Sequence, residues 1–382
     1  MDKSTINITP DKDRRVVTFV AVFYFVFAAN DSIQIIVNGS SLSKYISFGI
    51  LFLSLAIALP DIIIRRAKEC IVSESIFAIF FLLSGLMGYA ERNVLLKHAL
   101  WSMCICIPVA LAVLSISDKR KLINALYAEG LVSAFMSCVA LISMKDTDDY
   151  SMSSSYYLLI PVFLMINRFI EKRHIFDLVY PIVCVVISFM FGARGPLLCI
   201  AFYILIRIFI AGREKICRLI RFIICYIVCL LLVVGGLLFG IIYSQMKASG
   251  SYSRIMRLIS EGRIFYSAHR DELFAYYLKQ IKDHPLLGMG IGGGWLSMGL
   301  GPHNMLVELV LAFGIIIGGI MAVWFVSFYF QMFRIRDYDT KMLVFMFAAY
   351  CFTELFVEGD WTLSPQVFTF MALCIDEKIR LK

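Results

Sequence analysis

Long apolar runs recur along the whole chain, and they constrain its fold more than any other feature. A stretch of about 20 mostly apolar residues is enough to cross the hydrocarbon layer of a membrane. Apolar runs occupy residues 16–37, 46–64, 71–88, 98–116, 122–144, 156–170, 175–193, 196–211, 222–243, 304–330, 342–357 and 365–375. The sequence therefore predicts an all-α, polytopic membrane protein, with residues 1–382 forming one integral membrane domain of about 12 transmembrane helices.

The composition supports this class and excludes several others. Hydrophobic residues make up 60% of the chain and charged residues 17%, whereas soluble domains have roughly 45–50% and about 25%. A soluble enzyme, a disordered protein and a nucleic-acid-binding module are excluded on this basis. The 11 cysteines lie mostly inside apolar runs, without the spacing of a metal or redox motif. We therefore expect them to pack as small hydrophobic side chains.

The net charge of +8 reflects an excess of Lys and Arg, and the distribution of these residues among the loops indicates the orientation of the chain in the membrane. Loops rich in Lys and Arg stay in the cytoplasm. The basic segments are 12–15, 65–68, 119–121, 172–173, 213–221, 334–341 and 378–382. They alternate with the segments 38–44, 89–97, 145–155, a corner at Arg194, 244–302 and 358–364. This alternation predicts that both termini are cytoplasmic and that the second set of segments faces outward.

The outward segment 244–302 is much longer than the other connections, which in compact proteins have a median of about 4–6 residues. Its middle part, from His269 to Lys282, has apolar residues at helical spacing. These are Leu273, Phe274, Tyr277, Leu278 and Ile281. We expect an amphipathic helix on the outer membrane face, ended by His284 and Pro285, in a loop that is ordered enough to build a site.

A glycine-rich stretch at residues 288–294 follows this predicted helix. It is similar to the phosphate-binding loop of dinucleotide-binding proteins, but that loop follows a strand and opens a helix. We therefore interpret it as a turn that lets the chain come close to the membrane, with Gly290 near its centre. Backbone amides in such a turn remain able to contact an anionic ligand.

Three polar residues mark the point where the long loop returns to the membrane. His303 and Asn304 open the apolar run 304–330, and Glu308 follows about one turn later. A histidine in this position is often only an interfacial residue. A neutral imidazole is also able to accept a proton at physiological pH, which makes His303 a candidate general base.

Two arginines are candidates for binding a phosphate group. Arg194 occupies a short outward corner, where a retained positive charge opposes the orientation rule, although a side chain that reaches the lipid phosphates would explain it too. Arg270 belongs to the predicted loop helix, where a solvated polar face is the simpler explanation. The charge pattern alone does not distinguish it from the nearby residues Arg254, Arg257 and Arg263.

Three segments of the chain, read together, resemble the bacterial O-antigen polymerases and O-antigen ligases, which are integral membrane glycosyltransferases. The segments are 193–196 (Ala-Arg-Gly-Pro), 270–274 (Arg-Asp-Glu-Leu-Phe) running into 284–290, and 303–309, which begins with His-Asn. The likeness extends over about residues 183–319. Phe274 stands where the family usually has tryptophan, and Ala193 stands where many members have serine.

The resemblance implies roles for the candidate residues. It implies that His303 is the catalytic residue, that Arg194 and Arg270 bind pyrophosphate, and that Asn304, Glu308 and Gly290 support them. The implied donor is an oligosaccharide on a polyprenyl pyrophosphate, used without a metal or another cofactor. The implied partners are membrane lipids and a chain-length regulator protein, and nucleic acid is not among them. The implied location is the bacterial cytoplasmic membrane, with the active site facing the periplasm or the exterior.

Three functions remain open at this stage. The segment around His303 is closer to the polymerases, which join lipid-linked repeat units, than to the ligases, which transfer the glycan to lipid A core. A transporter or flippase for a lipid-linked glycan is the alternative from another class, and it requires ionisable residues along a path at membrane depth. The candidates for such a path are sparse: Asp61, Glu74, Asp177, Arg207 and Glu354.

Overall fold

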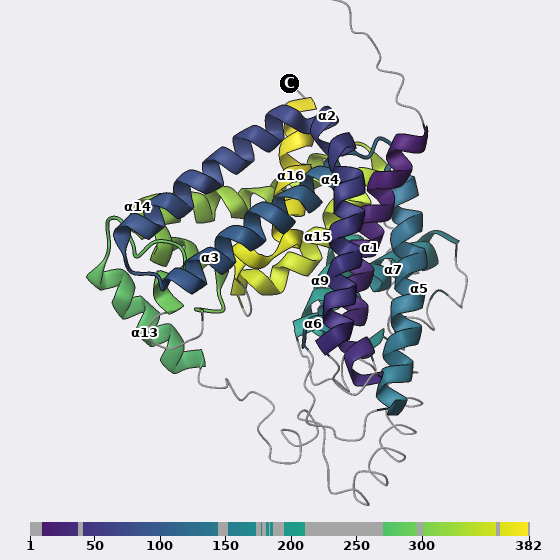
Figure 1. Ribbon diagram of the computed structural model, residues 1–382, viewed down its shortest axis with the longest axis horizontal. Helices are drawn as coiled ribbons and strands as arrows, with labels where there is room; N and C mark the ends of the chain where they lie inside the picture. The colour runs from purple at the N-terminus through teal and green to yellow at the C-terminus, as the bar shows by residue number, and fades with distance from the viewer. Residues whose placement is uncertain are drawn as a thin grey trace, which may run out of the picture. The chain divides into compact units, whose positions relative to one another are not determined.

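The computed structural model describes residues 10–36, 41–143, 152–172, 177, 181–182, 184–185, 195–210, 270–295, 301–356 and 360–380 (Figure 1). Every regular element in these residues is a helix. Among them, four helical stretches are long and apolar enough to cross a membrane: Tyr45–Met87, Arg92–Ser115, Lys119–Val139 and Met305–Arg334. The chain is therefore an all-helical membrane protein, as the apolar runs predict. The count of about 12 crossings stays a prediction.

The chain divides into two compact units. Unit 1 comprises Met1–Tyr24, Ser47–Leu126 and Ser267–Lys382, and unit 2 comprises Phe25–Ile46 and Tyr127–Tyr266. Helices α1 (Pro10–Ile36), α2 (Ser41–Met87) and α5 (Lys119–Ser143) contribute residues to both units. All the site residues predicted from the sequence belong to unit 1 except Arg194, which lies outside the described residues.

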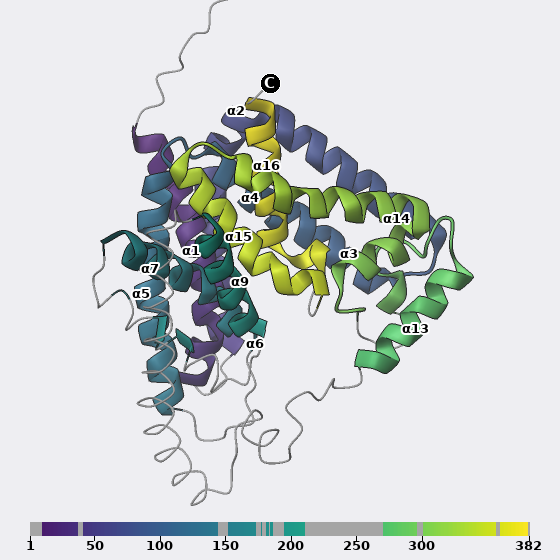
Figure 2. The same ribbon diagram turned by 180° about the vertical axis from the view of Figure 1, so that it is seen from behind.

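Unit 1 is built around tightly packed helices near the end of the chain. Its further elements are α3 (Arg92–Trp101), the π-helical turn η1 (Ser102–Cys106), α4 (Ile107–Ser115), α13 (Arg270–Asp283), η3 (Gly293–Trp295), α14 (Met305–Gln331), η4 (Met332–Arg334), α15 (Tyr338–Phe356), η5 (Trp361–Leu363) and α16 (Pro365–Arg380). Helix α16 packs against α4 and α15, and α15 is buried from Met342 to Cys351. The second half of α2 runs beside α14, as both views show (Figure 2).

Helix α2 is too long to cross a membrane once. Its 47 residues extend over roughly 70 Å at about 1.5 Å per residue, whereas the hydrocarbon layer is about 30 Å thick. The helix is interrupted at Arg66, where φ and ψ leave the helical region. This kink falls in the basic segment 65–68, which the sequence places between two apolar runs. Arg66 donates hydrogen bonds to Asp376 Oδ1 (2.7 Å) and to the carbonyl of Leu114 (3.0 Å).

Helix α14 is broken at Gly314, whose φ of 77° and ψ of 173° are not helical. The backbone groups freed at the break bond to residues 285–290. Ile315 N–H donates to Pro285 O (2.8 Å), while Leu311 O and Ala312 O accept from Met289 N–H (2.8 Å) and Gly290 N–H (2.9 Å). The segment 285–290, which runs into the glycine-rich turn, therefore bonds to both pieces of α14.

Unit 2 contains α6 (Met152–Tyr157), α7 (Leu159–Lys172), α9 (Gly195–Ile210) and the remaining parts of α1, α2 and α5. Gly130 of α5 packs directly against Pro161 of α7, since a Cβ at Gly130 would lie 2.0 Å from Pro161 Cβ. Glu129, the neighbour of Gly130 in α5, is buried and accepts a hydrogen bond from Ser133 Oγ (2.6 Å). Arg168 lies over the Tyr127 ring.

We predict that Gly314→Ala destabilises the protein, because a Cβ at this position would lie 2.2 Å from Leu286 O and Gly314 has a positive φ. The expected loss is at least about 1 kcal/mol. Gly319→Ala is the matched control in the same helix, since a Cβ there meets nothing within 4 Å. Thermal unfolding in detergent measures both variants, and equal midpoints would contradict the described break.

Candidate functional site

Helix α13 lies where the sequence predicts an amphipathic helix in the long loop. One face, formed by Leu273, Tyr277 and Ile281, is buried against Met289 and Leu311. The other two apolar residues named above, Phe274 and Leu278, are exposed, so only part of the predicted apolar face packs on the protein.

Tyr277 connects α13 to the glycine-rich turn. Its hydroxyl donates to Gly294 O (3.2 Å). Burial, together with the nearby Tyr276 and Glu308, raises the pKa of Tyr277 to about 12. Tyr277 is therefore a neutral hydrogen-bond donor at physiological pH.

The amides of the glycine-rich turn are engaged inside the protein. Those of Met289 and Gly290 close the break in α14, and that of Ile291 donates to Ser84 Oγ (2.9 Å). Gly290 itself has a φ of 75°, and a Cβ on it would lie 2.9 Å from Ser84 Cα. These three amides hold the turn against α14 and α2. An anionic ligand at the turn would therefore have to bind through other donors.

His303, Asn304 and Glu308 lie at the start of α14. Asn304 caps the helix, because its side-chain oxygen accepts from Leu306 N–H (3.0 Å) and Val307 N–H (3.1 Å). His303 directly precedes this cap, is half-buried and has a φ of 50°. Glu308 is buried, and its Oε2 accepts from Trp361 N–H (3.4 Å). The cap fixes the backbone that carries His303.

A buried polar cluster, which the sequence analysis did not identify, lies in the same unit. His98 of α3 is fully buried, and its Nδ1 is 2.6 Å from Thr362 Oγ1. Thr362 Oγ1 donates to Asp360 Oδ1 (2.7 Å), and Asp360 Oδ2 lies 3.3 Å from His98 Nε2. Two hydrogen bonds join these three residues, while His98 Nε2 and Asp360 Oδ2 are close but form no hydrogen bond; we call this cluster the His98 ring.

Further hydrogen bonds hold η5, which carries Thr362, against α3 and η1. Trp101 Nε1 donates to Leu363 O (2.8 Å), and Ser102 Oγ donates to Thr362 O (2.7 Å). Ser102 belongs to the π-helical turn, a rare distortion that occurs frequently at functional sites. Because Trp361 N–H also bonds to Glu308, η5 joins the His98 ring to the first turn of α14.

One signal in the sequence pointed to this cluster. The segments 89–97 and 358–364 and the start of the run 304–330 were all assigned to the outward side. The structure places α3, η5 and the start of α14 next to one another. The pairing of His98 with Thr362 joins residues 264 positions apart, and one sequence offers no local pattern for such a contact.

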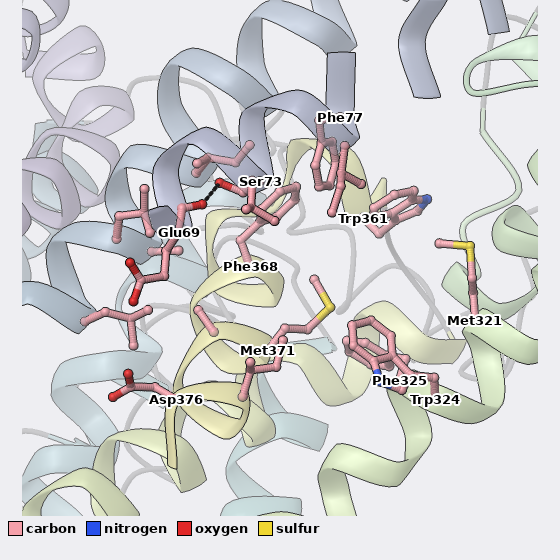
Figure 3. A pocket seen from close by; sticks show the side chains of 18 of the residues that line it. Glu69, Ser73, Phe77, Met321, Trp324, Phe325, Trp361, Phe368, Met371 and Asp376 are labelled. Atoms are coloured by element: carbon pink, nitrogen blue, oxygen red, sulfur yellow. Dashed lines mark hydrogen bonds between the residues drawn. The ribbon is translucent and has the colours of Figure 1, made fainter. Parts of the chain in front are cut away.

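A cavity of about 480 Å³ lies between the helices beside this cluster (Figure 3). Its lining is almost entirely aliphatic and aromatic and comes from α2, α4, α14, α16 and Trp361. Glu69 and Asp376 lie at one end, and Trp361 lies at the other. Met305 and Leu309, which flank Glu308 on the first turns of α14, also contribute. The chemistry of this lining suits a hydrocarbon chain.

The structure does not test whether the two predicted phosphate-binding arginines lie together. Arg194 lies outside them, and for Arg270 only the backbone at the start of α13 is described. Of the supporting residues, Asn304 and Glu308 lie beside His303, whereas Gly290 packs on Ser84. Within the described part of the chain, no group of three or more His, Cys, Asp or Glu is arranged to hold a metal ion.

Comparisons with known proteins find no relative. No protein-family model, curated protein or solved structure matches the chain significantly.

Asn304 allows a test of how the start of α14 is fixed. Asn304→Ala removes the acceptor for two amides and should lower the free energy of unfolding by about 1 kcal/mol. Asn304→Ser retains a capping oxygen and should stay within a few tenths of a kcal/mol of the wild type. Thermal unfolding of both variants measures the difference, and an equal loss in Ser and Ala would argue against the cap.

Proposed function

We propose that this protein is an O-antigen polymerase, a membrane glycosyltransferase that joins polyprenyl-pyrophosphate-linked repeat units at the outer face of the bacterial cytoplasmic membrane. The membrane-crossing helices and the three sequence segments that resemble this family support the proposal. A lipid-linked glycan has an apolar chain and a charged, polar head. A protein that acts on it needs an apolar site and a polar site close together.

One observation carries the proposal more than the others. In unit 1, the first turns of α14 contribute both to the apolar cavity, through Met305 and Leu309, and to a buried polar cluster, through Glu308. His303 directly precedes these turns. A hydrocarbon chain in the cavity would therefore place its polar head near the candidate base.

The reaction would be a displacement at the anomeric carbon of the donor sugar. His303 takes the proton from the acceptor hydroxyl, whose oxygen forms the new bond to this carbon while the bond to the pyrophosphate oxygen breaks. General-base catalysis of this kind typically supplies about 10²–10⁴-fold. Arg194 and Arg270 would neutralise the departing polyprenyl pyrophosphate, because guanidinium groups bind phosphate oxygens in a bidentate manner. Direct displacement inverts the anomeric configuration.

The proposal includes about 12 membrane crossings, cytoplasmic termini and a large outward loop. Contacts within unit 1 support this sidedness. Arg65 bonds to Asp13 and to Ser115 O, and Arg66 bonds to Asp376, so segments assigned to the cytoplasm contact one another. The outward segments that contain η5, the start of α14 and the start of α3 likewise contact one another.

An O-antigen ligase would use the same donor and needs only a different acceptor, lipid A core. A transporter or flippase is the alternative of another class, and the broken helix α14 is a feature that transporters use. In transporters the freed backbone groups coordinate the substrate or ion. In this protein the freed backbone groups at Leu311, Ala312 and Ile315 already bond to the segment 285–290. They are therefore taken up inside the protein, which favours the enzyme over the transporter.

We predict that His303→Asn abolishes glycan extension while protein level and thermal stability stay near those of the wild type. Asparagine is the sharpest replacement, because it tolerates the positive φ of this residue and lacks the imidazole base. The measurement is the length distribution of surface polysaccharide in cells that depend on this protein. His303→Ala, which adds backbone strain, is the comparison. Normal chain lengths in His303→Asn would make His303 an interfacial residue only.

Site-directed labelling tests the orientation. In a background without native cysteines, Leu287→Cys should react with a membrane-impermeant thiol reagent added from outside, because Leu287 is 72% exposed and lies in the long loop. Lys121→Cys is exposed in a basic segment and should react only after the membrane is opened. Labelling of both from the same side would overturn the topology and the placement of the proposed site.

A further inference from the structure

A second cavity in unit 1, of about 330 Å³, has a lining of a different kind. The described residues that line it are Arg14, Arg15 and Thr18 from the start of α1, and Ser54 and Ile57 from the first half of α2. Two guanidinium groups and two hydroxyl groups therefore meet here. Among these lining residues there is no carboxylate, so the chemistry of the cavity suits an anion.

Helix α1 turns one side towards this cavity. Arg14, Arg15 and Thr18 are exposed, whereas the residues at 16–17 and 19–20 are buried. Positions 14 and 18 are one helical turn apart and therefore lie on the same face. The buried residues pack inside the protein, and the polar ones are left on the side where the cavity opens.

The neighbouring carboxylates leave these arginines available to a ligand. Asp13 is already engaged, because Arg65 donates a hydrogen bond to it (2.5 Å). Asp61 is buried, and its Oδ2 lies 3.8 Å from Arg15 Nη1, which is an ion pair but too long for a hydrogen bond. Arg14 has no ion pair with the described residues. Both guanidinium groups thus keep N–H donors for an anion.

An apolar surface continues from the cavity along α2. Ile50, Leu53 and Ile57 are exposed and recur every three or four residues, so they lie on one face of the helix. They extend over roughly 10 Å at about 1.5 Å per residue, and half of the hydrocarbon layer measures about 15 Å. This face belongs to the apolar stretch Tyr45–Met87. A charged cavity at one end of an apolar face matches the shape of a phospholipid.

We propose that this cavity binds the phosphate of an anionic phospholipid, whose acyl chains lie along the exposed face of α2. Arg14 and Arg15 donate to the phosphate oxygens, which guanidinium groups match in a bidentate manner, and Thr18 adds a hydroxyl donor. Basic pockets between membrane helices recognise acidic lipid head groups in this way. A zwitterionic head group fits less well, because its ammonium group would meet no carboxylate in the lining.

In the proposed orientation of the chain, this lipid belongs to the cytoplasmic leaflet, because the segment 12–15 is one of the basic segments. The site is thus distinct from the proposed outward catalytic site. Binding of the lipid depends on the cavity alone, and it does not rest on the proposed glycosyl transfer.

Two variants and two matched controls isolate the site. Arg14→Gln removes one guanidinium group and breaks no ion pair among the described residues. Its control is Arg120→Gln, the same change at an exposed residue of unit 1 outside the cavity. Ser54→Phe fills the cavity without changing the charge. Its control is Ala56→Phe, at an exposed position of the same helix outside the lining.

The measurement is native mass spectrometry of the detergent-solubilised full chain, titrated with phosphatidylglycerol or with phosphatidylethanolamine of the same acyl chains. We expect one phosphatidylglycerol to bind at least about 5-fold more tightly than phosphatidylethanolamine. Arg14→Gln should weaken phosphatidylglycerol binding by about the same factor, which is the worth of one arginine near an anionic lipid. Ser54→Phe should also weaken it, and both controls should bind as the wild type does.

Equal binding of the two lipids would overturn the proposal, and so would an equal loss in Arg14→Gln and Arg120→Gln. Glycerol 1-phosphate, which is soluble and has the same phosphate chemistry, separates a lipid site from a site for free phosphate. If it displaces phosphatidylglycerol at equal concentration, the assignment to a lipid is wrong. Glycan extension is not part of this measurement, so a failure of the proposed function would leave its result unchanged.

Discussion

The break in helix α14 leaves backbone N–H and C=O groups without their helical partners, and the surrounding structure must supply hydrogen bonds for them. Backbone groups inside a membrane protein need internal hydrogen-bond partners, because lipid supplies none. At Gly314 the helical pattern stops, and the groups at Leu311, Ala312 and Ile315 pair with the segment 285–290 instead. This pairing fixes the end of the long loop against α14. Helix α13 then packs on the same place through Tyr277.

The same arrangement brings the polar and apolar parts of the candidate site together. The first piece of α14 begins at the Asn304 cap, presents Glu308 to η5 and turns Met305 and Leu309 towards the cavity. On its other side, η5 is held by the His98 ring. A substrate with a lipid chain and a charged head would find both environments within a few turns of one helix.

The sequence predicted those features that repeat along the chain or follow from charge. The apolar runs predicted helices, and the 3.6-residue period predicted the buried positions Leu273, Tyr277 and Ile281 of α13. The basic cluster at 65–68 coincides with the kink of α2 at Arg66. These features depend on local composition, so one sequence is enough to reveal them.

Other features depend on partners far away in the sequence. Gly314 lies inside a continuous apolar run, and nothing next to it signals that the N–H of Ile315 would donate to Pro285 O in place of a carbonyl of its own helix. His98 had no recognisable motif, because Asp360 and Thr362 join its cluster from the other end of the chain. The pairing of Arg194 with Arg270 stays a prediction, since Arg194 lies outside the described residues.

Reconstitution tests the proposed activity most directly. Purified protein in liposomes would be given polyprenyl-pyrophosphate-linked repeat units, with and without lipid A core, and the products would be separated by size. The account predicts glycans that lengthen by whole repeats on the lipid carrier when lipid A core is absent. Transfer only when the core is present would identify a ligase. Movement of unchanged lipid-linked units across the bilayer, without any new glycosidic bond, would contradict the assignment as an enzyme.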